Sequence, residues 1–529
     1  MTGDGGQMIL QRIANRGIRL GTLFDRAASR HPANFLILDH DLDLAPELGR
    51  RITVTEVADL VDDFASRLRA AGVRPGERVV VCKSNNFDIT LLACVAVRIG
   101  AVPVLLSPKL DGETVAELVR RVHKPHLVTD QAKLDDELPP TVFDHAHQVL
   151  LTKGGHPGAT QLESFAGVAR VPPVTMPPDH PTLITHTSGT TGIPKLAVHT
   201  GRTLEARYRP QASATALVRK RRPVAVHVSF VHSRLFTALA ITMLRGFPLI
   251  MLIDDDPEHV ADVFARLRPG VVEAHPNSFM RWERLADDPR KPLADVRYFS
   301  STFDAIHPRT VHRTLRASRH RMPIFGQLYG QSEVGPVVGR IFTRWRAEDA
   351  DGRCVGFPFP GMTDVRAVSM DGKPVTKSSP GYIEVRTDGR VLTYLGENER
   401  YHKQENDGWW RMGDVGYRTK WGCLHLLDRE VDVIPGFGST LAAEDTLFSA
   451  LDELVEVIIV PGQDGTAVPV VCTRGEEPLD MAAWKAATAS LPAMADPVQW
   501  RLADLPQTAT TKIKRLELAK LLSNGSQVP

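Results

Sequence analysis

Apolar residues along the chain alternate between helical spacing and short continuous runs. Thr53 and Glu56 have the spacing of a capping box, which marks the start of a helix. Apolar residues then recur every three or four positions, as in a helix with one buried face: Val57, Leu60, Val61, Phe64 and Leu68. The run Val79–Cys82 that follows is short enough for a buried strand.

The same alternation continues through the next two hundred or so residues. A helix is predicted over 115–122, and strands are predicted at 127–129, 183–185, 224–226, 248–253, 271–272 and 296–299. Strands separated by helices predict parallel sheets that are covered by helices on both faces. Beyond Gly361 short strands with glycine turns predict a β-rich part. After Arg429 a last unit has its own strands, at 454–460 and 468–472, and helices near 481–491 and from 514.

Composition and charge narrow the class of protein. The chain has 529 residues, 43% of them hydrophobic, enough for several cores. Because 64 Lys and Arg nearly balance 62 Asp and Glu, binding of nucleic acid by bulk charge is not expected. The longest apolar region, 91–106, contains Arg98 and is too short to span a membrane. The amino-terminal residues lack the pattern of a secretory signal, so we expect a cytoplasmic protein.

The cysteines give no sign of a metal or disulfide framework. Five are present, far apart in the sequence and without a Cys-x-x-Cys pair: Cys82, Cys94, Cys354, Cys423 and Cys472. We therefore expect neither a zinc site nor disulfides.

The most informative segment runs from Thr185 to Lys195 and reads Thr-His-Thr-Ser-Gly-Thr-Thr-Gly-Ile-Pro-Lys. Glycines let backbone N–H groups approach an anion, hydroxyls add donors, and Lys195 adds a positive charge. This composition suits a loop that wraps phosphates, although it is not a Walker A loop. On composition alone, an ordinary polar loop would be the favoured interpretation.

The order of residues resembles the phosphate loop of the adenylate-forming superfamily, which includes acyl-CoA synthetases, adenylation domains of peptide synthetases and luciferases. Four further segments resemble this family's motifs in the family's own order: Tyr329–Glu333, Gly408–Asp414, Asp428–Gly438 and Leu505–Arg515. The resemblance covers about residues 50 to 520.

This resemblance implies a fold and a division of the chain. The expected fold is α/β with a β-rich part, like that of acyl-CoA synthetases. A large N-terminal AMP-binding domain of α/β subdomains is expected over residues 1–428, and a small, mobile α+β domain over residues 429–529. The active site is expected between the two domains.

The resemblance also implies an activity, an acid–thiol ligase of the acyl-CoA synthetase type. Such an enzyme joins a small-molecule carboxylic acid to AMP and passes the acyl group to the thiol of coenzyme A. The expected cofactors are ATP or AMP, Mg²⁺ and coenzyme A, with no nucleic acid and no membrane span.

The resemblance also implies which residues bind the nucleotide, according to their positions in the motifs. Thr187, Ser188, Gly189, Thr190, Thr191, Gly192 and Lys195 are expected to hold the triphosphate. Tyr329 is expected to stack on adenine, and Ser332 to keep a hydroxyl for a phosphate oxygen. Asp414 is expected to accept the ribose hydroxyls, with Arg429 nearby.

Three residues are expected to take part in catalysis. Glu333 is expected to hold Mg²⁺, a hard cation suited to oxygen ligands. Lys512 is expected to balance the charge that builds between the carboxylate and the α-phosphate. His232 is expected beside the carboxylate, although a lone histidine is more often structural. Amino-acid-activating members have Phe-Asp where this chain has Phe230-Val231, which argues against an α-amino acid substrate.

Several departures from the family pattern leave alternatives open. Val431 occupies the hinge between the domains, where Asp or Lys is usual, and Thr511 replaces the glycine before Lys512. Ser300–Asp304 stands where a glycine-rich pair is usual. One alternative is therefore an enzyme that only transfers a preformed acyl-adenylate to coenzyme A, with a separate enzyme supplying the adenylate. A non-catalytic nucleotide-binding relative is the third.

Overall fold

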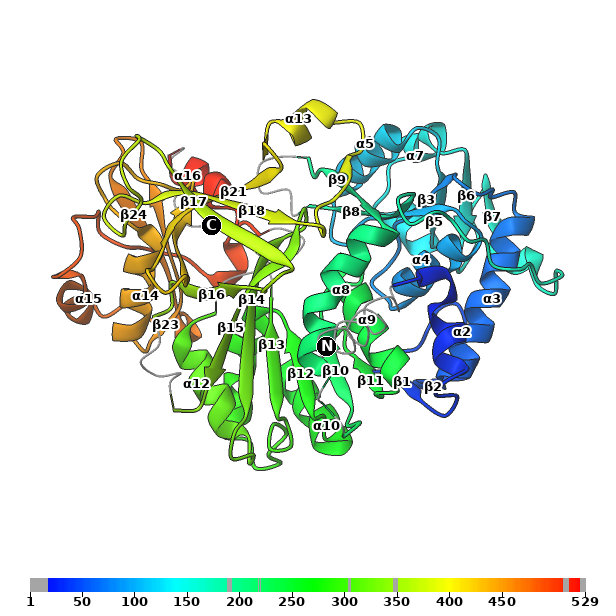
Figure 1. The fold of residues 1–529 in the computed structure, drawn as a ribbon, viewed down its shortest axis with the longest axis horizontal. Helices are drawn as coiled ribbons and strands as arrows, with labels where there is room; N and C mark the ends of the chain where they lie inside the picture. The colour runs from blue at the N-terminus through cyan, green and yellow to red at the C-terminus, as the bar shows by residue number, and fades with distance from the viewer. Residues whose placement is uncertain are drawn as a thin grey trace, which may run out of the picture.

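The computed structural model describes residues 18–187, 193–216, 218, 220–302, 306–345, 351–507 and 513–523. Two large sheets and one small sheet organise these residues (Figure 1). The expected α/β fold with a β-rich part is confirmed, because mostly parallel strands alternate with helices up to about residue 330 and antiparallel strands follow.

The first sheet has eight described strands in the order β19-β9-β8-β4-β3-β5-β6-β7. They are β3 (Arg78–Val81), β4 (Val102–Leu105), β5 (His126–Thr129), β6 (Gln148–Leu151), β7 (Ala159–Gln161), β8 (Pro181–His186), β9 (Leu196–Thr200) and β19 (Thr393–Tyr394). The strands from β8 to β7 pair in parallel, whereas β9 is antiparallel to both of its neighbours.

The second sheet has 14 described strands, in the order β17-β18-β21-β22-β16-β15-β14-β13-β12-β10-β11-β1-β2, with β20 beside β21. Its first half contains β1 (Phe35–Leu38), β2 (Arg51–Thr53), β10 (Val224–His227), β11 (Leu249–Met251), β12 (Val271–Ala274), β13 (Tyr298–Ser301) and β14 (Ile324–Gln331). The β-rich half contains β15 (Gly335–Thr343), β16 (Cys354–Pro358), β17 (Thr363–Ser369), β18 (Gly381–Thr387), β20 (Glu405–Asn406), β21 (Trp409–Arg418) and β22 (Leu424–Arg429).

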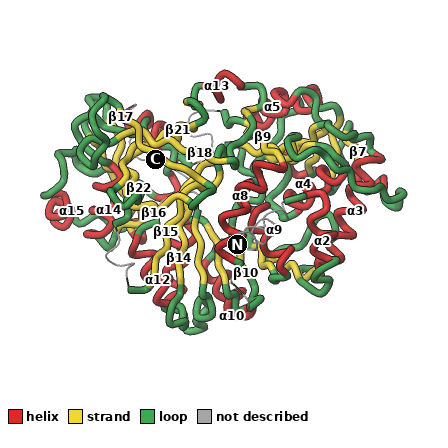
Figure 2. Tube along the Cα trace, in the orientation of Figure 1, coloured by secondary structure: helices red, strands yellow, loops and turns green. Residues whose placement is uncertain are grey.

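Helices form layers between and outside these sheets (Figure 2). One hydrophobic cluster joins both sheets through the helices between them: α2 (Leu23–Ala28), α3 (Val54–Ala70), α4 (Asp88–Arg98), α8 (Gly201–Thr215) and α9 (Ser233–Arg245). The outer face of the eight-stranded sheet carries α5 (Gly112–Val122), α6 (Gln131–Asp136) and α7 (Thr141–His145). The outer face of the other sheet carries α10 (Pro257–Leu267), α11 (Pro276–Arg281) and α12 (Pro308–Ala317).

Short elements complete the described chain. They are α13 (Asn398–His402) and the 3₁₀ helices η1 (Leu20–Thr22), η2 (Pro46–Leu48), η3 (Leu162–Phe165), η4 (Trp282–Ala286), η5 (Arg474–Glu476) and η6 (Leu502–Asp504). The predicted capping box is confirmed at the start of α3, where the Thr53 side chain accepts from the Glu56 N–H and the Glu56 carboxylate accepts from the Thr53 N–H.

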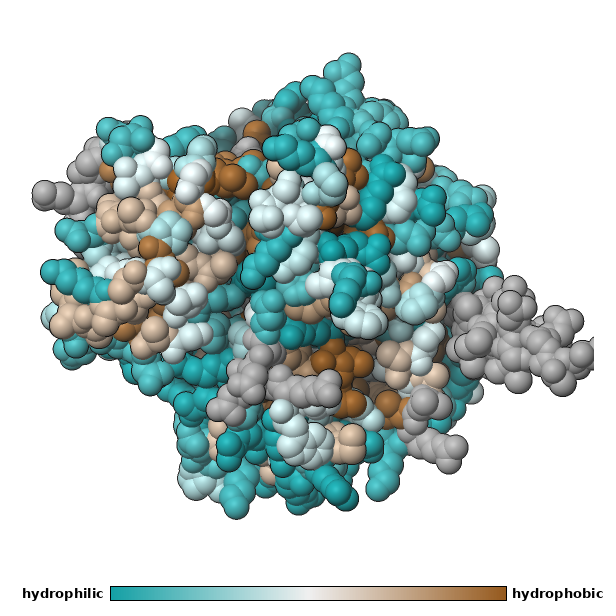
Figure 3. All heavy atoms as spheres, turned by 60° about the vertical axis from the view of Figure 1, so that its left-hand side comes forward, coloured by the Kyte–Doolittle hydropathy of each residue, from teal (hydrophilic) through white to brown (hydrophobic). Residues whose placement is uncertain are grey.

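Hydrophilic side chains cover most of the face in Figure 3. No described helix is both long enough and apolar enough to cross a membrane.

The last part of the chain forms a unit with its own sheet. Strands β23 (Leu454–Pro461), β24 (Ala467–Thr473) and β25 (Val498–Gln499) pack with α14 (Thr440–Ala450), α15 (Met481–Thr488) and α16 (Arg515–Ser523). Two hydrophobic clusters draw only on residues after 433. The domain boundary after residue 428 and the mobility of this unit stay predictions.

The expectation that no disulfide is present was wrong. Cys354 and Cys423 form a disulfide that joins β16 to the start of β22. The two cysteines are 69 residues apart in the sequence, so only the pairing of these strands brings them together. Spacing along the chain does not show such a contact.

Reduction of this disulfide should lower the free energy of unfolding by about 2–4 kcal/mol, because it removes a constraint on the unfolded chain. Urea unfolding with and without reductant measures the difference, and a Cys354→Ala/Cys423→Ala variant should match the reduced protein. Burial raises the pKa of Cys82, Cys94 and Cys472 to about 12, so these thiols should not contribute. Identical unfolding curves with and without reductant would contradict this prediction.

Asp428 connects β22 to the start of α14. Its Oδ1 accepts hydrogen bonds from the Thr440 N–H at 3.1 Å and the Thr440 hydroxyl at 2.5 Å. Burial raises the pKa of Asp428 to about 6, against the effect of these bonds. Folding therefore disfavours the ionised carboxylate, and the stability that the protonated form provides is lost as pH rises from about 4 through 6.

An Asp428→Asn variant stays neutral at every pH. We expect it to exceed the wild type in unfolding free energy by about 1–3 kcal/mol at pH 7 and to match it near pH 4. Urea unfolding at both pH values tests this. A variant that is less stable than the wild type by the same amount at both values would show that the hydrogen bonds, not the charge, dominate.

Candidate active site

The predicted phosphate loop lies between β8 and β9. Thr187 and Lys195 close its base, because the Thr187 N–H donates to the Lys195 carbonyl at 2.9 Å and the Lys195 N–H donates to the Thr187 hydroxyl at 3.2 Å. Residues 188–192, which include Ser188, Gly189, Thr190, Thr191 and Gly192, lie outside the described residues. These two hydrogen bonds therefore hold the two ends of the loop next to each other.

Lys195 and Glu333 come together although they are 138 residues apart. The Lys195 Nζ lies 3.1 Å from the Glu333 Oε1, which also accepts from the Tyr394 hydroxyl at 2.6 Å. Burial alone would raise the pKa of Glu333, but Lys195 and Tyr394 outweigh it and lower the pKa below its ordinary value. The carboxylate is therefore ionised at neutral pH, as a metal ligand must be.

Tyr329, Asp414 and Arg429 form a second group, on β14, β21 and the end of β22. The Tyr329 hydroxyl donates to Asp414 Oδ2 at 2.5 Å, and the Arg429 Nε lies 3.0 Å from Asp414 Oδ1. Asp414 is buried, whereas the Arg429 side chain is nearly half exposed. The fold thus brings together the three residues predicted for adenine and ribose, and their roles stay predictions.

Arg207, which the motifs did not indicate, lies buried against the Tyr329–Glu333 segment. Its Nε donates to the Gly389 carbonyl, its Nη1 to the Ser233 hydroxyl and its Nη2 to the Ser332 carbonyl, at 2.7, 3.0 and 2.9 Å. No described carboxylate forms an ion pair with Arg207. Burial lowers its pKa to about 9, so the guanidinium keeps its charge at neutral pH.

Two glycines make room for this arginine. A Cβ at Gly335 would lie 2.7 Å from the Arg207 Cγ, and a Cβ at Gly389 would lie 3.0 Å from the same atom. Arg207 connects α8 to the Tyr329–Glu333 segment through Ser332 and to α9 through Ser233. Arg207, Lys195 and Glu333 together carry two positive charges and one negative charge, which favours anionic ligands.

His232 caps α9, because its Nδ1 accepts from the Arg234 N–H at 3.1 Å. This is a structural role, and its predicted place beside the substrate stays a prediction. A second histidine, His199 on β9, was not indicated by the sequence; its Nε2 lies 2.9 Å from the Thr185 hydroxyl. Burial, followed by Arg207 and His232, lowers the pKa of His199 well below 6.5, so its ring is neutral.

Other predicted residues are only partly described. Lys512, Thr511 and residues 303–305 lie outside the described residues. Val431 follows Arg429 in a turn and is 56% exposed. The sequence signal that could have revealed Arg207 is an arginine on an otherwise buried face of α8, where Leu204, Tyr208 and Gln211 are also buried.

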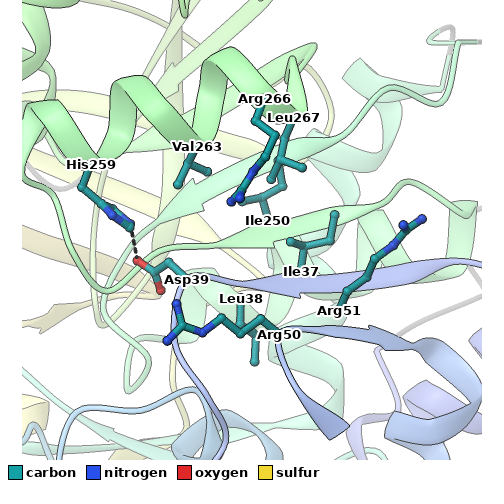
Figure 4. Close-up of a pocket in the computed structure, with 10 residues that line it drawn as sticks. All are labelled: Ile37, Leu38, Asp39, Arg50, Arg51, Ile250, His259, Val263, Arg266 and Leu267. Carbon is teal, nitrogen blue, oxygen red and sulfur yellow. Dashed lines mark ion pairs between the residues drawn. The ribbon is translucent and has the colours of Figure 1, made fainter.

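A separate recess of about 490 Å³ lies at the edge of the larger sheet, between β1, β2, β11 and α10 (Figure 4). Its polar lining includes Asp39, Arg50, Arg51 and Arg266, with His259 3.5 Å from Asp39. None of the predicted site residues lines this recess, and we assign it no role.

Comparison with known proteins gives a family and close relatives. A family model described as AMP-binding enzyme matches residues 24–395. A 3-amino-2-hydroxy-4-methoxybenzoate diazotase of Streptomyces cremeus is 47% identical over 97% of both chains. A 3-aminoavenalumate diazotase of a Streptomyces species is 26% identical over 77% of this chain and 74% of the relative. The structure of an o-succinylbenzoate CoA synthetase of Bacillus subtilis with an acyl-adenylate has a TM-score of 0.77 at 17% identity, covering 94% of this chain and 97% of that chain.

These findings correct the expected activity. The full-length relative at 47% identity is a diazotase, so the expectation of an acyl-CoA synthetase, with its thioesterification-only and non-catalytic alternatives, was wrong. The motifs concern the expected nucleotide site. They do not show in which reaction the adenylate is used. Binding of coenzyme A was expected only because a synthetase was expected. It stays a prediction, and the name of this relative gives it no support.

Proposed function

This chain belongs to the AMP-binding family of adenylate-forming, ATP-binding enzymes, and from that premise we propose that it is an ATP-dependent diazotase. It would convert the primary amine of an aromatic carboxylic acid into a diazonium group. The observation that carries this proposal is the 47% identity over almost the whole length to the diazotase of Streptomyces cremeus. The substrate named for that relative is an aminobenzoate with oxygen substituents next to the amine.

Diazotisation needs a second nitrogen at the oxidation level of a nitroso group, and we propose nitrite as its source. Nitrite is an oxyanion, like the carboxylate that other family members activate. A nitrite oxygen would attack the α-phosphate of ATP, forming an O–P bond while pyrophosphate leaves. The product is a mixed anhydride of nitrous acid and AMP, in which AMP is a good leaving group.

The aryl amine would then attack the nitroso nitrogen of this anhydride. An N–N bond forms, the N–O bond to AMP breaks, and the amine loses a proton. The resulting N-nitrosamine rearranges to a diazohydroxide and loses hydroxide to give the diazonium ion. Overall, amine, nitrite and ATP give diazonium, AMP, pyrophosphate and water, so atoms and charge balance without an added oxidant.

The described site suits the first step because two anions must meet there. Lys195 and Arg207 supply positive charge near Glu333, and both Arg207 and Glu333 are buried. Glu333 would hold Mg²⁺, since its ionised carboxylate is a hard oxygen ligand. That ion would supply charge neutralisation at the phosphates.

Other roles carry over as part of the proposal. The loop 187–195 would bind the triphosphate, Tyr329 the adenine, and Asp414 with Arg429 the ribose. Ser332 would offer its hydroxyl to a phosphate oxygen. Lys512 would approach the α-phosphate during attack by nitrite. His232, next to Ser233 at the start of α9, would lie on the side from which the amine approaches.

The test is a coupling assay with purified protein, ATP, Mg²⁺, nitrite and 3-amino-2-hydroxybenzoate. Diazonium is trapped by an electron-rich arene to give an azo dye, and AMP is measured in parallel. We expect dye and AMP in equal amounts, with neither formed when nitrite is omitted. Formation of a thioester from added coenzyme A, without any dye, would contradict the proposal.

A further inference from the structure

Three buried polar atoms near the proposed site have no hydrogen-bond partner among the described residues. They are the Glu273 Oε1, the Arg234 Nε and the Gln211 Nε2. One is an acceptor and two are donors. Buried polar atoms are ordinarily satisfied, and three unpaired atoms on directly bonded side chains are positioned to contact a ligand.

The three side chains form one connected group. The Arg234 Nη2 lies 2.5 Å from the Glu273 Oε2, and the Arg234 Nη1 donates to the Gln211 Oε1. These bonds fix which atoms stay free. Arg234 holds the second oxygen of Glu273 and the oxygen of Gln211, which leaves the carboxylate Oε1 and the amide Nε2 unpaired.

The group adjoins the proposed reaction site. Gln211 lies one helical turn beyond Arg207 on α8, and Arg234 directly follows Ser233, which Arg207 contacts. Glu273 on β12 is in register with Ser300 on β13, and Ser300 with Gly326 on β14. Residues in register on neighbouring strands share one face of a sheet, so these three lie side by side.

That face has room for a ligand beside Gly326. A Cβ at Gly326 would have a single neighbour within 4 Å, the Phe299 carbonyl oxygen at 3.7 Å. The strand partner of Glu273 on β10 is Val226, which belongs to the core shared with α8 and α9. The open face is therefore turned towards the two helices that carry Gln211 and Arg234.

We propose that Glu273, Arg234 and Gln211 recognise the aryl amine together with an oxygen substituent beside it. The amine N–H donates to the Glu273 Oε1, and the neighbouring oxygen accepts from Arg234 or Gln211. The ring lies over Gly326 and Ser300. This inference rests on the proposed diazotase function and adds the residues that recognise an aromatic acid in which amine and oxygen are adjacent.

Burial raises the pKa of Glu273, and Arg234 counteracts that shift. The contact with Arg234 holds the Glu273 Oε2 in place and leaves the Oε1 as a buried acceptor for the amine. A role in binding the amine also explains why Arg234 and Glu273 are buried here, with side-chain exposures of only 9% and 7%. Apolar residues would fill the same space, but they could not distinguish an amine from a hydrogen atom.

The first experiment compares binding of 3-amino-2-hydroxybenzoate and 2-hydroxybenzoate to the full-length protein by titration calorimetry, without nitrite. The wild type should prefer the amine by roughly 10- to 100-fold, because the analogue leaves the Glu273 Oε1 unpaired. In Glu273→Gln, Arg234 would still attract the amide oxygen, so the amide NH₂ would face the amine. The preference should fall below about threefold.

Glu384→Gln is the matched control. Glu384 is also buried and paired with an arginine, Arg366, but its second oxygen already accepts from Asn406. It should keep the full preference for the amine. Because Glu273→Gln leaves Arg234 without a counter-charge, the double variant Glu273→Gln/Arg234→Met provides a second test in which the buried pair is removed together.

A folded Glu273→Gln or double variant that keeps the wild-type preference would overturn the inference. The same follows if the wild type binds both compounds equally. These outcomes leave the proposed function untouched, because dye formation is measured separately. Conversely, absence of dye with the wild type would refute the diazotase while the binding preference could still hold.

Discussion

Replacing Glu333 with Gln is expected to lower the rate of diazonium formation by roughly 100- to 1,000-fold. Glu333 is buried, and its Oε1 is held by Lys195 and Tyr394, so its carboxylate points in a fixed direction. An amide of the same shape has no charge for Mg²⁺ and would leave Lys195 without a counter-charge. The loss should therefore reside in the use of ATP rather than in binding of the amine.

A Mg²⁺ titration distinguishes this role from simple damage to the fold. Glu333→Gln should need a higher Mg²⁺ concentration for half-maximal rate. Tyr394→Phe, which keeps the carboxylate and removes one hydrogen bond, should lose only about tenfold. Because Lys195 and Tyr394 lower the pKa of Glu333 below its ordinary value, its ionisation should not limit the rate at neutral pH. An unchanged Mg²⁺ requirement in Glu333→Gln would contradict the metal-binding role.

Replacing Arg207 with Met should lower the same rate by roughly 100-fold. The change removes a buried charge and leaves the Ser332 and Gly389 carbonyls without their donor. Arg207 donates to three protein groups that hold its side chain in place, so we regard it as a positioning residue that also contributes charge. Its loss should raise the KM for nitrite and also lower kcat.

Arg207→Lys separates charge from positioning. A lysine keeps the positive charge but cannot reach three acceptors with a planar group. If charge is the main contribution, the lysine variant should recover most of the affinity for nitrite while kcat stays low. A lysine variant identical to Arg207→Met in both constants would show that attraction of the anion plays no part.

Features that depend on neighbouring residues could be predicted from the sequence. The capping box at Thr53 and Glu56 is local, so its spacing alone locates the start of α3. The predicted phosphate loop is a continuous segment of the sequence, and its two ends are hydrogen-bonded through Thr187 and Lys195, while its role stays a prediction. Alternation of apolar runs and helical spacing likewise indicated the α/β fold.

Features that depend on distant residues could not be predicted. The Cys354–Cys423 disulfide requires that β16 and β22 be neighbours in the sheet. Arg207 is one of many arginines until the glycines at 335 and 389 are seen to enclose it. The sequence also does not show that Glu273 is paired with Arg234, because they lie 39 residues apart on different elements.

There is also a physical reason why the motifs predicted the wrong activity. All five motifs are expected to bind and position ATP, and that task is the same whether the attacking oxyanion is a carboxylate or nitrite. In our proposal the two reactions differ in the residues that contact the second substrate, and the candidates for that role lie on α8, α9 and β12. The motifs therefore do not identify the group that reacts with the adenylate.

The central claim is that nitrite, and not the carboxylate of the aromatic acid, attacks ATP. It is tested most directly by supplying nitrite labelled with oxygen-18 and measuring AMP by mass spectrometry. We predict that the AMP formed together with diazonium carries one labelled oxygen on its phosphate. Unlabelled AMP from this experiment, with label transferred instead from an oxygen-18 carboxylate of the substrate, would contradict the claim.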